Sequence, residues 1–174
     1  MPSRSYTSRT EFEQYRFSLP VTLLVPLTLL LLQAYLPKIF PSLLILDLPL
    51  LAVIFFAVGR RNPIAGAITG ALIGLFEDAL TGRPIGINGM AKTIIGYAAS
   101  SIGLQVDVEN VLTRLLMNLG FSLLQSLLLF LIQRYLLGIR EYHLLWLHEL
   151  LRAALNTAVA IPLFALLDRT KRRE

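Results

Sequence analysis

The chain has 174 residues, of which 55% are hydrophobic and only 16% are charged, and its mean hydropathy is +0.66. Soluble domains carry charge on about a quarter of their residues, so this composition excludes an ordinary soluble domain and predicts a membrane protein. The absence of cysteine excludes disulfides, thiolate metal sites and cysteine nucleophiles. The net charge of +5 is concentrated in the two tails and one short loop, which is a topology pattern and not a nucleic-acid-binding face.

Apolar segments separated by turn signals predict an all-α bundle of six transmembrane helices. About 20 helical residues cross the roughly 30 Å core of a bilayer, and a helix satisfies its own backbone groups in lipid. The expected spans are 17–36, stopping at Pro37, then 43–58, 64–80, 87–102, 111–137, and a last span that begins between 144 and 150 and ends at 167. Gly and Pro stand beside a basic residue in the breaks PKIFPS (37–42), GRRNP (59–63) and TGRPIG (81–86).

The tails and the basic residues predict the domain organisation and the orientation. The expected parts are an N-terminal tail (1–16), one six-helix membrane domain (17–168) and a basic C-terminal tail (169–174). With the N-terminus inside, most Lys and Arg residues fall on the inner side, as the positive-inside rule requires. Both termini are therefore expected in the cytoplasm.

Six ionisable residues of the spans fall at a similar depth, near the outer side. They are Asp47, Glu77, Asp78, Lys92, Glu149 and Arg152. A charge at mid-bilayer costs about 2.5–3.5 kcal/mol and normally faces a partner inside the bundle. Lys92 is the expected partner of Glu77 or Asp78, and Glu149 and Arg152 are spaced to pair on one helix face. Two interpretations remain open: a ligand cavity or partner-docking site, and a self-neutralised network that fixes helix register.

Small residues form stripes on the third and fourth spans. Gly66, Gly70 and Gly74 recur every four residues, and Gly96 lies on a similar small face with Gly89, Thr93, Ser100 and Gly103. Such stripes let helices approach closely. Packing inside the bundle is expected for most of these residues, and the alternative is that one stripe receives a helix from another protein.

No catalytic or metal-binding motif stands out. Asn118, Ser122 and Gln125 share one face of the fifth span, where interhelical hydrogen bonds explain them, and His143 and His148 do not share a helix face. Neighbours such as Glu77 and Asp78 point about 100° apart on a helix, so they do not form a converging acid–base pair. We therefore expect neither an enzyme nor a bound cofactor.

The segment GLFEDALTGRPIGINGMAKTIIGYAAS (74–100) resembles the MreD family of rod shape-determining proteins. That family carries Gly-Leu-x-x-Asp, three variable residues and Gly-x-x-Leu-Gly, followed by a span rich in small residues with an aromatic toward its end. The matching positions are Gly74, Leu75, Asp78, Gly82, Gly86 and Tyr97, with Pro84 before Ile85 in the usual Leu place. Glu77 departs from the apolar residue usual there, so the implied role of the motif rests on Asp78.

The resemblance implies a non-enzymatic subunit of the bacterial inner membrane that binds MreC. In the family this pair links cytoplasmic MreB to the synthases RodA and a class B penicillin-binding transpeptidase. The family fold is similar to the S-components of energy-coupling-factor transporters, which supplies the alternative function, uptake of a small vitamin-type molecule. For the motif Gly74, Asp78, Gly82, Pro84 and Gly86 we expect a structural or partner-binding role. Asp78 would brace the turn by pairing with Lys92 or by accepting backbone N–H groups from the loop.

Overall fold

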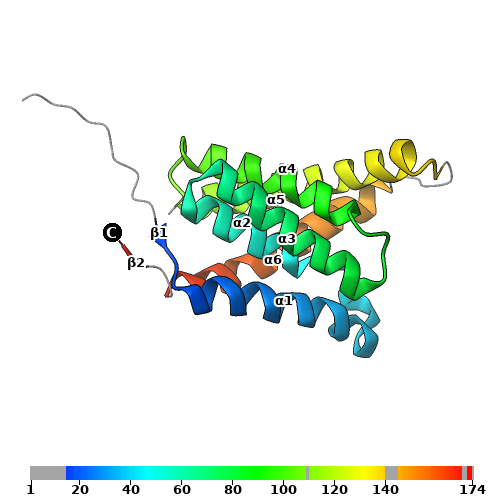
Figure 1. The fold of residues 1–174 in the computed structure, drawn as a ribbon, viewed down its shortest axis with the longest axis horizontal. Coiled ribbons are helices and arrows are strands. Elements are labelled where there is room, and N and C mark those ends of the chain that lie inside the picture. Colours follow the sequence, from blue (N-terminus) through cyan, green and yellow to red (C-terminus); the bar gives the residue numbers. More distant parts are fainter. Residues whose placement is uncertain (1–14, 109, 140–144, 170–171, 174) are drawn as a thin grey trace, which may run out of the picture.

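The computed structural model describes residues 15–108, 110–139, 145–169 and 172–173. Tyr142 and His143 of the last connection, and most of the N-terminal tail, lie outside the described residues. These described residues form six α-helices that lie side by side along the long axis of the molecule (Figure 1). They are α1 (Leu19–Ile39), α2 (Leu48–Arg60), α3 (Pro63–Thr81), α4 (Ile87–Gly103), α5 (Val111–Leu131) and α6 (Trp146–Asp168). The expected all-α, six-helix bundle is confirmed.

Four short elements complete the described fold. A 3₁₀ turn, η1 (Pro41–Ile45), precedes α2, and a π-helical turn, η2 (Ile132–Leu136), extends α5. Near the two termini, β1 (Tyr15–Arg16) pairs antiparallel with β2 (Arg172–Arg173). This pairing brings the first and the last described residues to the same end of the bundle (Figure 1).

Prolines and polar caps explain where the helices begin. Asp47 caps α2 by accepting a hydrogen bond from the Leu50 N–H at 2.9 Å, and Asn62 caps α3 by accepting from the Ala65 N–H at 3.1 Å. Both helices carry proline in the first turn, where its missing N–H leaves no bond unmade. The observed bounds of α3 and α4 differ by at most one residue from the expected spans 64–80 and 87–102.

The structure corrects the first two expected spans. Helix α1 does not stop at Pro37 but continues to Ile39, because a proline near the helix end removes only one hydrogen bond, and the Phe40 N–H still bonds to the Leu36 carbonyl at 2.9 Å. The second span does not run from 43, because Asp47 caps a helix that starts at Leu48. With 13 residues, α2 is about 20 Å long and shorter than the bilayer core.

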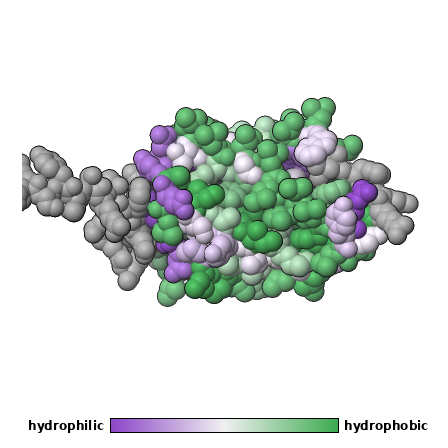
Figure 2. Space-filling model, turned by 90° about the horizontal axis from the view of Figure 1, so that it is seen from above, coloured by the Kyte–Doolittle hydropathy of each residue, from purple (hydrophilic) through white to green (hydrophobic). Residues whose placement is uncertain are grey.

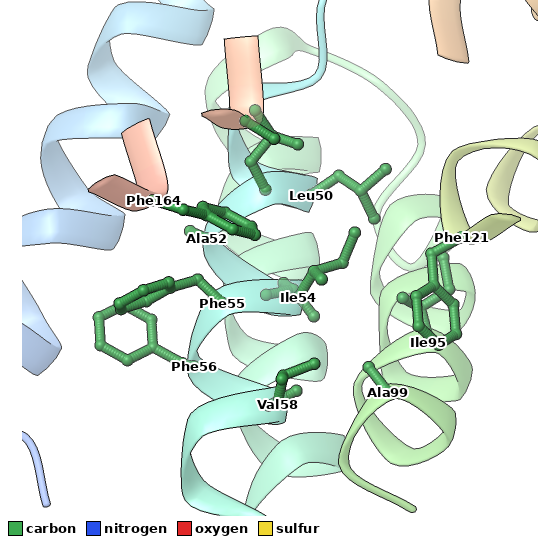
Figure 3. Close-up of a cluster of buried hydrophobic side chains, with 14 of the residues drawn as sticks. Leu50, Ala52, Ile54, Phe55, Phe56, Val58, Ile95, Ala99, Phe121 and Phe164 are labelled. Atoms are coloured by element: carbon green, nitrogen blue, oxygen red, sulfur yellow. The ribbon is translucent and has the colours of Figure 1, made fainter. Parts of the chain in front are cut away.

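Helix α2 is the centre of the core, and the other helices surround it. Every residue from 48 to 59 is buried. Its phenylalanines contact Phe17 and Phe164 with ring centroids 5.0–5.5 Å apart, and its other side meets Ile95 and Phe121 (Figure 3). Burying such side chains stabilises the fold by about 1.5–3 kcal/mol each in water, and in lipid the close packing itself holds the helices together.

The outer surface has the character expected in a bilayer. Four helices are long and apolar enough to cross a membrane: Leu19–Ile39, Pro63–Thr81, Val111–Leu136 and Trp146–Asp168. Apolar residues cover the middle of the molecule, and polar residues gather toward its two ends (Figure 2). The exposed aromatics Tyr35, Tyr135 and Trp146 belong to the last turns of α1, to η2 and to the first residue of α6, and such positions near helix ends suit a membrane interface.

Candidate functional site

Helices α3 and α4 touch backbone to backbone through their glycines. A Cβ added at Gly74 would lie 2.6 Å from the Asn88 carbonyl carbon and 2.7 Å from the Gly89 nitrogen, and one added at Gly70 would meet the Lys92 carbonyl. Gly66 and Gly96 face each other in the same way. The stripe on α3 is therefore occupied by α4, not by a helix of another protein, and the contact fixes the position of Lys92 next to the end of α3.

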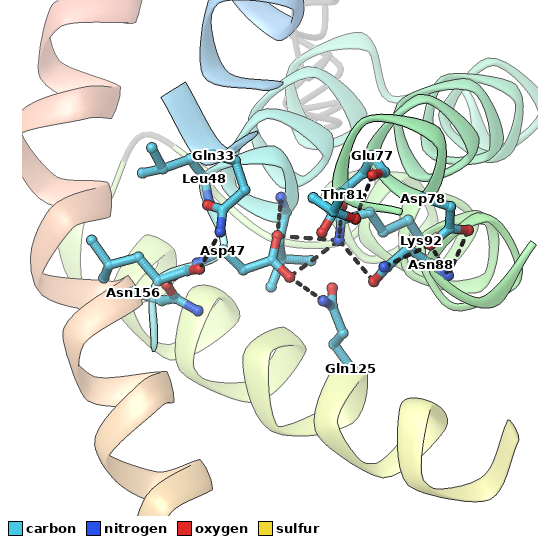
Figure 4. A network of polar contacts seen from close by, with 12 residues as sticks. Gln33, Asp47, Leu48, Glu77, Asp78, Thr81, Asn88, Lys92, Gln125 and Asn156 are labelled. Carbon is cyan, nitrogen blue, oxygen red and sulfur yellow. Dashed lines mark hydrogen bonds and ion pairs between the residues drawn. The ribbon is translucent and has the colours of Figure 1, made fainter. Parts of the chain in front are cut away.

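Lys92 is the centre of a buried polar cluster (Figure 4). Its side chain is completely buried, and its Nζ lies 2.6 Å from Glu77 Oε2 and 3.1 Å from both carboxylate oxygens of Asp47. Of the two partners expected from the sequence, the structure has Glu77 and not Asp78. The pairing with Asp47 from α2 was not foreseen.

Asp47 connects four helices at the start of α2. Its carboxylate accepts hydrogen bonds from Lys92 on α4, from Gln125 Nε2 on α5 and from Arg152 Nη2 on α6, the last at 3.2 Å. Its own N–H donates to Asn156 Oδ1 at 2.9 Å. Because this side chain also caps α2, the register of the central helix depends on partners from three other helices.

The cluster extends outward along α6. Arg152 Nη1 lies 3.7 Å from Glu149 Oε2, and the same oxygen accepts a hydrogen bond from Ser126 at 2.5 Å. Five of the six ionisable residues expected near the outer side thus form one connected chain in the order Glu77, Lys92, Asp47, Arg152, Glu149. Each cation lies between two carboxylates, so the charges compensate one another within the protein.

Asp78 serves a separate site, because it is the next residue on α3 and points to another side. It is fully buried and accepts backbone hydrogen bonds from Gly86 at 2.8 Å, from Asn88 at 3.1 Å and from Gly89 at 3.3 Å. It also accepts from Asn88 Nδ2 at 2.8 Å. These donors belong to the turn and to the first residues of α4, where the helix dipole favours a negative charge. The structure has the second of the two arrangements expected for Asp78.

Two glycines adopt the positive φ angles that the α3–α4 turn requires. Gly82 ends α3 with φ 68°, and Gly86 precedes α4 with φ 106°, a region that other residues rarely adopt. Asn88 then joins this turn to the cluster, since its side chain donates to Asp78 and its Oδ1 lies 3.5 Å from Lys92 Nζ. The motif residues therefore position the α3–α4 turn and, through it, Lys92.

Several neutral residues of this site are not predicted from the sequence, and some of the predicted interhelical hydrogen bonds are not found among the described residues. Asn88, Ser126 and Asn156 make direct contacts, as does Gln33, whose side chain bonds to the Leu46 carbonyl and the Leu48 N–H. Each is a polar residue in an apolar span, which is the signal that could have found them. Only Gln125 makes the interhelical bond expected for the polar face of α5: Asn118 bonds within its own helix, and no partner of Ser122 Oγ lies among the described residues.

The described residues contain no group of three or more His, Cys, Asp or Glu side chains placed to hold a metal ion. His148 is exposed near the start of α6.

The comparisons with known proteins identify the family. The family model described as rod shape-determining protein MreD matches residues 14–170. No curated protein and no solved structure matches the chain, so the likeness to transporter S-components stays an expectation. The matched range contains all six helices, the polar cluster and the turn that Asp78 braces. The chain therefore belongs to the MreD family of rod shape-determining proteins.

Proposed function

We propose that this chain is a non-enzymatic scaffold of the rod-shape machinery that binds MreC in the bacterial inner membrane. Membership of the MreD family gives it a role in rod-shape determination and a membrane context. Beyond this family role, we propose that MreC is the partner and that the chain assembles other proteins and catalyses no reaction.

The observation that carries the scaffold proposal is the closed state of the polar cluster. Glu77, Lys92 and Asp47 are 0–5% exposed at their side chains and pair with one another. A carrier or an enzyme needs polar groups that are free to meet a substrate, whereas these groups already contact each other. The cluster therefore acts as a clamp that holds α2, α3, α4 and α6 in register, and the uptake alternative gains no support from it.

A scaffold with a packed interior must bind its partners on its outer surface. Between α4 and α5 lies an apolar groove of about 480 Å³, lined by residues that include Leu116, Gly120 and Leu124. MreC-type proteins have a single membrane span, and such a span packs against small and apolar residues. We propose that MreC meets an outward face of the bundle, with both termini of this chain in the cytoplasm.

In this role the chain would connect the two sides of the membrane indirectly. MreC would reach into the periplasm with its large domain. MreB, RodA and the class B penicillin-binding transpeptidase would bind this chain either directly or through MreC. The bundle itself supplies a rigid membrane platform, because the clamp and the braced turn leave its helices little freedom to shift.

The test is recovery of partners from native membranes of the source bacterium. The tagged chain is purified in mild detergent and everything that accompanies it is identified by mass spectrometry, with an unrelated tagged six-helix membrane protein as the control. MreC, with or without RodA and the transpeptidase, is the expected companion. Recovery of an ATPase pair or a bound metabolite without MreC would overturn the scaffold proposal and favour uptake.

A further inference from the structure

A second groove runs along the outside of the bundle between α1 and α3. It has a volume of about 510 Å³, within the range of about 300–1,000 Å³ that is typical of small-molecule sites. Its lining is almost wholly apolar and includes Leu23, Leu27, Ile68, Leu72 and Phe76. Along α3 it extends from Ala65 to Leu80, which is about 22 Å at the rise of an α-helix. Its shape and lining suit a hydrocarbon chain.

One end of this groove carries a fixed cation. Arg60, the last residue of α2, donates from Nη2 to Thr22 Oγ1 at 3.0 Å and from Nη1 to Thr69 Oγ1 at 3.2 Å. These two hydroxyls belong to the opposite walls, α1 and α3, so the guanidinium spans the groove at its end. The Phe56 ring lies behind it, with its centroid 5.7 Å from the guanidinium carbon.

Arg60 has no carboxylate counter-ion among the described residues. Arg152 and Arg114 each pair with carboxylates, whereas no carboxylate of the described chain pairs with Arg60. A guanidinium has five N–H donors, and the two threonines accept from only two nitrogens. The remaining donors therefore favour an anionic ligand, and a phosphate is the anion that the planar guanidinium binds with two parallel bonds.

We propose that this groove binds an anionic phospholipid, with the phosphate at Arg60 and an acyl chain between α1 and α3. The ligand has the two parts that the site demands: an anion at the groove's end and a hydrocarbon tail along its apolar length. A partner's membrane helix would fill the apolar part but would bring no anion to Arg60. The site is independent of MreC binding and adds a lipid-binding function to the scaffold.

The experiment measures retained lipid. The chain is purified in detergent, incubated with micelles containing equal amounts of phosphatidylglycerol and phosphatidylethanolamine, and analysed by native mass spectrometry. Arg60→Gln removes the cation, and Ile68→Trp, at a side chain that is 56% exposed, fills the groove without removing charge. Arg114→Gln is the matched control, because this arginine already has Asp168 as its counter-ion. Circular dichroism verifies that each variant is folded.

The wild type and Arg114→Gln are expected to retain phosphatidylglycerol in preference to phosphatidylethanolamine. Arg60→Gln and Ile68→Trp should each reduce that retention about tenfold, which corresponds to about 1.4 kcal/mol. Equal retention of both lipids by the wild type, or unchanged retention in folded Ile68→Trp, would overturn the proposal. So would a cross-link from a cysteine placed at Leu72 to a partner's membrane helix in native membranes, since that helix would then occupy the groove.

Discussion

Replacement of Asp78 by asparagine tests the braced turn most sharply, because it keeps the shape of the side chain and removes its charge. In the structure both carboxylate oxygens face donors: Oδ2 accepts from Gly86 N–H at 2.8 Å, and Oδ1 accepts from Asn88 Nδ2 at 2.8 Å. An amide has only one oxygen. Whichever way the new side chain turns, its NH₂ group therefore points at another donor.

The size of the effect follows from these contacts. At least one hydrogen bond to a charged acceptor is lost, and such a bond contributes about 1.5–3 kcal/mol. A buried donor is also left without an acceptor, at a cost of about 1–3 kcal/mol. Because the turn can relax and the two terms overlap, we expect Asp78→Asn to lower the free energy of unfolding by about 2–4 kcal/mol.

The assay is reversible unfolding in mixed micelles with an increasing mole fraction of sodium dodecyl sulfate, followed by circular dichroism. Gln105→Glu is the matched control, since it also changes the charge of a side chain by one unit, at an exposed position of the α4–α5 connection, and it should change the free energy by less than about 0.5 kcal/mol. If Asp78→Asn also stays within about 0.5 kcal/mol of the wild type, the carboxylate does not brace the turn.

The same titration checks three further predictions. Gly70→Ala should lower the free energy of unfolding by about 1–3 kcal/mol, because the new Cβ would meet the Lys92 carbonyl. Gly120→Ala is its control and should raise the free energy of unfolding by up to about 1 kcal/mol, because nothing lies within 4 Å of the new Cβ. Equal effects of the two substitutions would refute the backbone contact between α3 and α4. Lys92→Met leaves Asp47 and Glu77 without their shared cation and should cost about 3–5 kcal/mol, and a cost below about 1 kcal/mol would contradict the clamp. Arg114→Ala should cost no more than about 1 kcal/mol, because its pair with Asp168 is 18% and 31% exposed, and a larger loss would mean that this surface pair also holds the bundle.

Local sequence signals were sufficient for α3 and α4 but not for α2. The expected spans 64–80 and 87–102 differ from the observed helices by one residue at most, because Pro63, Gly82 and Gly86 mark the ends chemically. Hydropathy does not distinguish a helix that faces lipid from one that faces other helices, so α2 was expected to be an ordinary span. Asp47 followed by Leu-Pro-Leu is a cap signal that would have placed the start of α2 correctly.

Depth along the helices was enough to group the charged residues but not to pair them. Asp47, Lys92 and Arg152 were expected together because they lie at one level of the membrane, and the structure joins them. Which carboxylate Lys92 meets depends on how α3 and α4 are rotated about their axes, and that rotation is set by the glycine contacts between these two helices. Neutral members such as Gln125 and Asn156 were not assigned to the cluster because an amide in a span has many possible partners.

We propose that the buried cluster holds the bundle together and that MreC binds the outer surface. The double variant Glu77→Leu/Lys92→Met tests it directly, since one cation and one carboxylate leave together and Asp47 keeps Arg152, Gln125 and the Leu50 N–H. Replacement of a buried ion pair by apolar residues is often tolerated, so this variant should fold. We predict that the folded double variant recovers as much MreC from native membranes as the wild type does. A folded variant that loses MreC, while the wild type retains it, would show that MreC binding depends on the cluster and would refute a purely structural role for it.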